Sequence, residues 1–163
     1  MSREVNIAII IPCYNEQENI LVLYNELIRT KFPEDYNVVP IFVNDCSTDD
    51  SKNILKQNNI VYIDLSVNLG IGGAVQTGFK YALDNNFSIA VQMDGDGQHP
   101  PSELSKLLTP ILECKGDVVI GSRYITREGF QSSVLRRMGI NYFTNLNKWL
   151  TGTNVSDSTS GYR

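Results

Sequence analysis

The sequence has few basic residues, few cysteines and no long hydrophobic run. Lysine and arginine number 14 against 18 aspartates and glutamates, which gives a formal net charge of -4 and a pI near 4.9. Because binding to a nucleic-acid backbone needs concentrated positive charge, this balance argues against a nucleic-acid partner. The apolar run near the N-terminus is too short for a membrane span or a signal peptide. We therefore expect a cytosolic chain.

The three cysteines, Cys13, Cys46 and Cys114, are far apart and form no C-x-x-C pair. This spacing indicates neither a disulfide framework nor a zinc site, so we expect reduced thiols. The 163 residues, 42% of them hydrophobic, suffice for one domain with a substantial core and are too few for two comfortable ones. We expect a single domain over residues 1–163.

What the sequence does contain is a regular alternation of β-branched runs and amphipathic segments. Four such β-α units in succession predict a parallel sheet with helices on its faces. The expected strands are Val5–Ile11, Val38–Val43, Ile60–Leu65, Ile89–Met93 and Val118–Gly121. The expected helices lie after Asn15, from about Asp49, over Ile71–Asn85, from Ser102 and over Val134–Leu150.

The first expected helix carries a local start signal. Asn15 can cap it, with Glu18 reaching back in a capping box. One apolar stripe at helical spacing would then face the sheet, formed by Ile20, Leu23, Leu27 and Ile28.

In a parallel sheet, the loops at the carboxyl ends of the strands build the ligand site. In this sequence the segments that follow the five expected strands are polar: PCYNE, NDCSTD, NLGIGG, DGDGQHP and GSRY. Their position, more than their composition, makes them candidates for function.

The fourth segment places Asp94 and Asp96 at the end of a buried strand. Two carboxylates this close repel each other and lose hydration unless a cation or water reaches them. In an extended backbone both side chains, and that of Gln98, share a face and can meet on one Mg²⁺ or Mn²⁺. A solvated Asp-Gly turn explains the same residues about as well, because D-x-D by itself is a weak motif.

Other candidates keep two explanations each. The segment NLGIGGAVQTG lacks a full dinucleotide fingerprint, since Val75 stands where its third glycine belongs. Amides from Gly70 to Gly73 either face a phosphate or permit a tight turn. His99 is a phosphate or metal contact, or simply a turn residue. Helix capping explains only one of the carboxylates of Asp45 and Asp49.

Taken together, the ordered segments PCYNE, NDCSTDDS, NLGIGGA, DGDGQHP, GSRY and DSTSGYR resemble the family 2 glycosyltransferases of GT-A fold. The resemblance covers essentially the whole chain and is closest to the dolichyl- and polyprenyl-phosphate sugar transferases. It implies an α/β fold with a Rossmann-like, mostly parallel sheet and helices on both faces. Residues of about 1–100 would bind the nucleotide, and 101–163 would form the acceptor side. Relatives continue beyond SGYR, so we expect a C-terminally truncated acceptor side.

The resemblance also implies roles for single residues. Nucleotide binding would fall to Pro12, Tyr14, Glu16, Asp45, Gly70 and Asp94. A divalent ion, Mg²⁺ or Mn²⁺, would be held by Asp94, Asp96 and Gln98. An acceptor phosphate would be held by Arg123, Arg136 and Arg137. Catalysis would involve Arg123 and Asp157, the latter as candidate general base.

The activity implied is inverting, metal-dependent transfer of a sugar from a UDP- or GDP-linked donor to a polyprenyl phosphate or a glycan, in cell-wall or polysaccharide synthesis. The alternative is a domain that binds the sugar nucleotide without turnover. Ile71 departs from the family pattern, because many relatives carry a basic residue after NLG. The resemblance is compatible with association with the cytoplasmic face of a membrane and with a homodimer.

Overall fold

The computed structural model describes residues 5–95, 100–121 and 160–163 of the chain. The chain divides into two compact units, Met1–Ser105 and Lys106–Arg163. The first unit contains the sheet and the helices α1 to α3. A short 3-10 turn, η1 (Pro101–Glu103), and the helix α4 (Leu104–Leu112) follow at the point where the units divide.

The first unit is built on four parallel strands in the order β3-β2-β1-β4, as the alternation in the sequence predicts. The strands are β1 (Val5–Cys13), β2 (Tyr36–Asn44), β3 (Tyr62–Asp64) and β4 (Ile89–Gln92). β1 pairs with β2 along its whole length and with β4 on its other side. This central position explains its unbroken β-branched run, because residues 7 to 13 are buried on both faces of the sheet.

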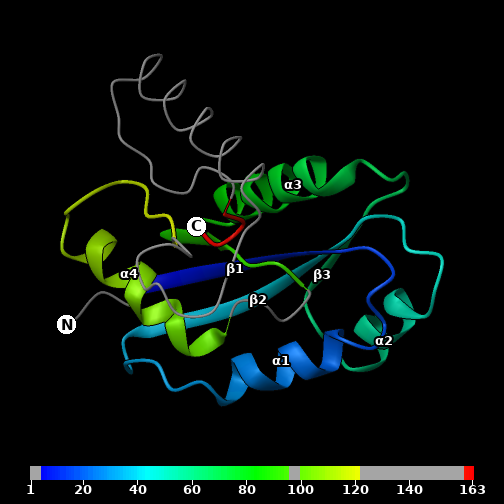
Figure 1. The fold of residues 1–163 in the computed structure, drawn as a ribbon, viewed down its shortest axis with the longest axis horizontal. Coiled ribbons are helices and arrows are strands. Elements are labelled where there is room, and N and C mark those ends of the chain that lie inside the picture. Colours follow the sequence, from blue (N-terminus) through cyan, green and yellow to red (C-terminus); the bar gives the residue numbers. More distant parts are fainter. Residues whose placement is uncertain (1–4, 96–99, 122–159) are drawn as a thin grey trace, which may run out of the picture. The chain divides into compact units, whose positions relative to one another are not determined.

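Helices cover both faces of this sheet. α3 (Gly70–Asp84) lies on one face, and α1 (Ile20–Arg29) and α2 (Ser51–Gln57) lie on the other (Figure 1). Because strand side chains alternate, the inward residues divide between two layers. The layer under α3 is formed by Ala8, Ile10, Ile41, Val43, Ala74 and Ala82. The expectation of helices on both faces is therefore confirmed.

A glycine allows α3 to approach the sheet closely. A Cβ atom added at Gly78 would overlap Cγ2 of Ile10 and would lie 3.2 Å from Cγ2 of Val43. Near the start of the same helix, a Cβ added at Gly72 would meet no atom within 4 Å. Only the first of these two glycines is therefore required by packing.

The predicted cap of the first helix is wrong. α1 begins at Ile20, and Asn19, which precedes it, makes no side-chain capping hydrogen bond. Asn15 instead has a positive φ of 56°, and its side-chain oxygen accepts a hydrogen bond from the Thr48 N–H at 2.8 Å. Its partner is thus on another loop. The predicted stripe is correct except for Ile28, which is exposed.

The predicted strand Val118–Gly121 is also wrong. These residues have no strand conformation, and the Val118 side chain is 74% exposed. The Gly121 N–H donates to the Tyr162 carbonyl oxygen at 2.8 Å, which is one bond and no ladder within the described residues. The expected helix over 134–150 lies outside the described residues. Within the described ranges, every helix is too short or too polar to cross a bilayer.

Candidate active site

A cavity of about 260 Å³ opens at the carboxyl ends of β1, β2 and β4. Its walls also include the first turns of α3. It is lined by Pro12, Cys13, Tyr14, Glu16, Asp45, Ile71, Ala74, Asp94 and Gly95. Loops that are far apart in the sequence therefore contribute to one hollow, at the edge of the sheet where open parallel sheets bind ligands.

Most of the nucleotide-binding residues expected from the sequence line this cavity. Pro12, Tyr14, Glu16, Asp45 and Asp94 do so, whereas Gly70 lies outside the lining. The other expected site residues lie outside the described residues: Asp96, Gln98, Arg123, Arg136, Arg137 and Asp157. The metal, acceptor and base assignments that depend on them remain predictions.

Asp45 lines the cavity and connects three elements. It is buried, and its N–H donates to the Cys13 carbonyl oxygen at 2.9 Å. Its Oδ1 accepts a hydrogen bond from the Leu69 N–H at 2.7 Å, just before α3 begins. Asn68 adds a bond from its side-chain amide to the Asp45 carbonyl oxygen at 3.2 Å. Asp45 therefore has a structural role that sequence reasoning missed.

Gly70 is the first residue of α3, at the tight turn by which the chain enters this helix. Its φ of 73° lies in the left-handed region, which favours glycine. Its N–H donates to the side-chain oxygen of Asn68 at 3.1 Å. The turn explanation therefore applies to Gly70, while a phosphate contact at this glycine stays a prediction. Ile71, the departure from the family pattern, is 62% exposed at the cavity wall.

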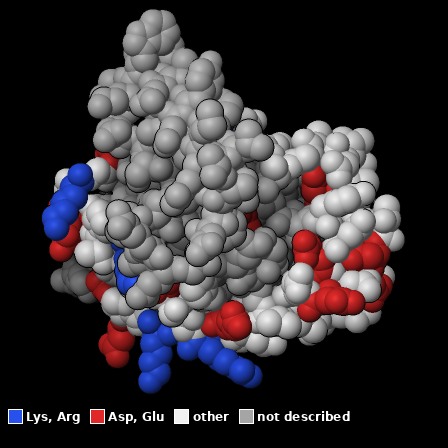
Figure 2. All heavy atoms as spheres, in the orientation of Figure 1, with Lys and Arg blue, Asp and Glu red and all other residues white. Residues whose placement is uncertain are grey.

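The electrostatic environment of the cavity is negative. Burial, together with the smaller effects of the nearby carboxylates of Glu16, Asp49 and Asp45, raises the pKa of the Cys13 thiol to about 12. A second hollow of about 200 Å³ beside the cavity is lined in part by Glu16, Glu18 and Asp49. Figure 2 shows acidic side chains gathered on the right of the view, where Figure 1 places α2. A cation is the natural counterpart of such a surface.

Cys13 is expected to be inert to iodoacetamide at pH 8. The thiolate is the reacting form, and a buried thiol with a pKa of about 12 supplies almost none. The exposed Cys114 in the same native chain is expected to react at least roughly 100-fold faster. Mass spectrometry of the labelled peptides would measure both rates, with the urea-unfolded chain as control. Equal labelling rates of Cys13 and Cys114 in the native protein would contradict the burial and the raised pKa of Cys13.

The chemistry of the lining fits a hard divalent ion. Asp94 offers carboxylate oxygens and is half-buried, with its Oδ1 3.4 Å from the side-chain amide of Gln92. Cys13, held as a neutral thiol, is a poor ligand for a soft metal. Oxygen donors of this kind suit Mg²⁺ or Mn²⁺ better than zinc. The described residues contain no group of three ionisable ligands, so further donors would come from Asp96, Gln98 or a bound diphosphate.

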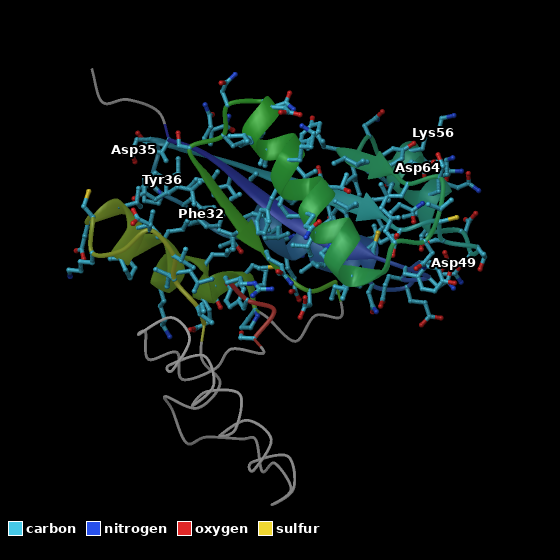
Figure 3. All side chains as sticks on the ribbon, turned by 90° about the horizontal axis from the view of Figure 1, so that it is seen from above. Phe32, Asp35, Tyr36, Asp49, Lys56 and Asp64 are labelled. Carbon is cyan, nitrogen blue, oxygen red and sulfur yellow. The ribbon has the colours of Figure 1, made fainter. Side chains whose placement is uncertain are left out.

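A larger hollow, of about 430 Å³, lies among Leu27, Phe32, Tyr36 and Pro40, where β2 begins. Figure 3 shows Phe32 and Tyr36 at the end of the sheet opposite to Asp49 and Asp64. This hollow is remote from the carboxyl ends of the strands, and Glu34 is its one ionisable lining residue besides Tyr36. Position and chemistry therefore favour the smaller cavity as the active site.

Sequence reasoning assigned no role at the cavity to Cys13, Ala74 or Gly95. Cys13 and Gly95 are next to predicted site residues in the sequence, and Ala74 lies one turn into α3. This proximity is the only feature of the sequence that indicates a place at the cavity. A Cβ atom added at Gly95 would lie 3.1 Å from the Pro12 carbonyl oxygen, so a side chain there would crowd the wall of the cavity.

Comparison with known proteins gives the following matches. Residues 8–163 match the family model described as glycosyl transferase family 2. A UDP-N-acetylglucosamine–dolichyl-phosphate N-acetylglucosaminyltransferase of Methanococcus voltae is 33% identical over 178 residues, covering 96% of this chain and 68% of the relative. The polyprenol monophosphomannose synthase of Mycolicibacterium smegmatis is 31% identical over 162 residues, covering 95% of this chain and 59% of the relative.

A solved structure shares the fold. It is the glucosyl-3-phosphoglycerate synthase of Mycobacterium tuberculosis in complex with Mn²⁺, UDP-glucose and phosphoglyceric acid. The TM-score is 0.63 at 18% sequence identity, over 97% of this chain and 55% of the other. This likeness confirms the predicted α/β fold. The chain spans 59% of the length of the M. smegmatis relative and 68% of that of the M. voltae relative.

Proposed function

Because the chain belongs to glycosyl transferase family 2 and has its predicted GT-A fold, we propose that it binds a nucleoside-diphosphate sugar in the cavity at the carboxyl ends of β1, β2 and β4. The observation that carries this proposal is the convergence of Tyr14, Glu16, Asp45 and Asp94 on one hollow. These residues come from three separate loops, and the sequence motifs single out all three loops.

Within the cavity, the described residues have distinct tasks. Tyr14 is half-exposed at the wall and offers its ring to the base. Asp45 keeps a fixed orientation because its Oδ1 accepts the Leu69 N–H, so its other oxygen serves the base. Such orientation before the ligand arrives lowers the entropy lost on binding.

The ion that we propose is Mg²⁺ or Mn²⁺, held by Asp94, Asp96 and Gln98. When bound, it supplies positive charge to the departing diphosphate. Asp94 has the ligand chemistry that this requires, and the negative surroundings of Cys13 favour a cation in the same cavity. The crystal structure of the M. tuberculosis synthase, which shares the fold, contains Mn²⁺ together with UDP-glucose.

The reaction that we propose is an inverting displacement at the anomeric carbon. The acceptor oxygen forms the new bond as the nucleoside diphosphate leaves. The names of both curated relatives specify a dolichyl or polyprenol acceptor, and we propose a polyprenyl phosphate or a glycan here. Arg123, with Arg136 or Arg137, would hold an acceptor phosphate through guanidinium forks. Asp157 would remove the proton from a hydroxyl acceptor, or only position a phosphate that is already ionised.

We assign nucleotide binding to about residues 1–100 and the acceptor side to 101–163. A cytoplasmic location, at the membrane surface that displays the acceptor, is part of the same proposal. A second candidate is donor binding without turnover, because the described residues that line the cavity include most of those proposed to bind the nucleotide and none of those proposed to bind the acceptor. Release of free sugar or transfer product in the presence of Mn²⁺ would separate the two: turnover supports the transferase, and binding alone supports the second candidate.

A calorimetric titration of the chain with UDP and with GDP, each with and without Mn²⁺, tests the proposed binding. We expect one of the two nucleotides to bind, and Mn²⁺ to tighten its binding by roughly tenfold or more, since the ion shares both carboxylate and diphosphate oxygens. Inorganic phosphate with Mn²⁺ is the control for unspecific anion binding. If neither nucleotide produced heat of binding in either condition, the proposed function would be wrong.

A further inference from the structure

Two loops that line the cavity are joined by hydrogen bonds between side chains and backbone. One loop follows β1 and covers residues 14–19, and the other follows β2 and covers 45–50, ending at the start of α2. We call this set of bonds the cross-loop clamp. Its side chains are Asn15, Gln17, Ser47, Asp49 and Ser51.

The bonds of the cross-loop clamp run in both directions. The Asn15 N–H donates to Ser47 Oγ at 3.0 Å, and the Thr48 N–H donates back to Asn15 Oδ1 at 2.8 Å. The Glu16 N–H donates to Ser51 Oγ at 3.0 Å. Each of these bonds pairs a side chain of one segment with a backbone N–H of the other. Side chains, and not a backbone ladder, therefore set the spacing of the two loops.

Gln17 and Asp49 extend the cross-loop clamp. The Gln17 N–H donates to Asp49 Oδ2 at 3.1 Å, and the Asp50 N–H donates to Gln17 Oε1 at 3.0 Å. Burial would raise the pKa of Asp49, but hydrogen bonds from Ser51 and from the Gln17 N–H outweigh it and lower that pKa. The Asp49 side chain therefore stays charged in the clamp at neutral pH. Figure 3 shows Asp49 at the end of the sheet where the parallel strands terminate.

The cross-loop clamp acts where the β1–β2 ladder has stopped. The register of the two strands ends at Cys13 opposite Asn44, and the next backbone bond between them, from the Asp45 N–H to the Cys13 carbonyl oxygen, is the last. Tyr14 and Glu16 flank Asn15 and line one wall of the cavity, and Asp45 lines another. Beyond this point, among the described residues, the loops are joined by the hydrogen bonds of the clamp and by the Thr48 hydroxyl, which donates to Asn15 Oδ1 at 3.3 Å.

We propose that Asn15 is a positioning residue of the nucleotide site, which through Thr48 and Ser47 fixes the wall carrying Tyr14 and Glu16 relative to Asp45. This inference rests on the proposed nucleotide binding. Asn15 itself does not line the cavity, so its effect on a ligand passes through its neighbours. Its positive φ suits asparagine, one of the few residues besides glycine that adopts this conformation readily.

The test compares glycine substitutions at two asparagines with positive φ. Asn15→Gly keeps the backbone conformation and removes the side-chain acceptor. Asn86→Gly does the same at φ 59°, after the end of α3 and away from the cavity. Asn15→Asp keeps the acceptor oxygen that the Thr48 N–H uses. Affinity for UDP and GDP with Mn²⁺, hydrogen exchange of the Thr48 amide, and Tm are measured for the parent chain and for each variant.

We expect Asn15→Gly to weaken nucleotide binding roughly tenfold, because the two hydrogen bonds that Asn15 Oδ1 accepts from Thr48 are lost. Its Thr48 amide should exchange faster, while its Tm stays close to that of Asn86→Gly. Asn15→Asp should restore the protection of the Thr48 amide and most of the affinity. Unchanged affinity in Asn15→Gly, with normal binding by the parent chain, would overturn the inference and leave the proposed function standing.

Two further outcomes are informative. If Asn15→Gly lowered Tm well below that of Asn86→Gly but bound nucleotide normally at temperatures below its transition, Asn15 would have only a structural role, and the inference would be wrong. If the parent chain bound neither nucleotide, both the inference and the proposed function would be wrong. The pattern across parent and variant therefore tells the two failures apart.

Discussion

Gly78→Ala is expected to lower the free energy of unfolding by about 1–3 kcal/mol, the usual cost of overpacking a core. The new methyl group would overlap Cγ2 of Ile10, and Val43 blocks movement to the side. Both neighbours lie in the fully buried layer under α3, so α3 would have to move away from the sheet. The gain in helix propensity, at most about 1 kcal/mol, offsets only part of this cost.

Gly72→Ala is the matched control, because it makes the same substitution in the same helix. A Cβ atom there meets nothing within 4 Å, so only the propensity gain applies. We expect the free energy of unfolding to rise by about 0.5–1 kcal/mol. Urea unfolding of both variants and the parent would measure the changes. If the free energy of unfolding rose in both variants, α3 would not approach β1 as closely as the structure shows.

Asp94→Asn is expected to weaken the affinity for Mn²⁺ at least roughly 100-fold, and so to remove most of the gain in nucleotide affinity that Mn²⁺ gives the parent chain. Replacing even the hydrogen-bond partner of a metal ligand costs about 10- to 100-fold in affinity, and a ligand should cost no less. Asparagine keeps the size of the side chain and one acceptor oxygen, so the fold should survive. Titration of the nucleotide that the parent chain binds, with and without Mn²⁺, would isolate the metal-dependent part.

Asp84→Asn is the control for charge alone. Asp84 pairs with Lys80 at 3.1 Å on the exposed last turn of α3, the opposite end of that helix from the cavity. Its substitution should leave the binding of both metal and nucleotide unchanged, because an exposed pair of this kind contributes little. Asp96→Ala should resemble Asp94→Asn. Undiminished coupling between Mn²⁺ and nucleotide in Asp94→Asn would rule out the proposed ion site.

The sheet could be predicted because its signal is local. The β-branched run ended by Pro12 follows from a central strand that is buried on both faces, and the amphipathic stripe of α1 follows from packing on one face only. The same reasoning failed at Val118–Gly121. A short apolar run says nothing about whether a neighbouring strand is present to pair with it.

The site could be predicted in part for a different reason. Residues directly after parallel strands meet at one edge of the sheet, so Tyr14, Asp45 and Asp94 could be grouped without knowing the distances between them. Asn15 could not be interpreted in this way. Its local pattern is that of a helix cap, but its actual partner, Thr48, is 33 residues further along the chain.

The sequence by itself determined the alternation of strands and helices, and with it the parallel sheet and the edge at which the motif loops gather. Periodicity records which face of each element is buried, and that information is local. Only the tertiary structure decided that Asn15 joins two loops, that Asp45 holds the start of α3, and that carboxylates surround Cys13. These features depend on distances between residues far apart in the chain, which only the packing of the helices on the sheet sets.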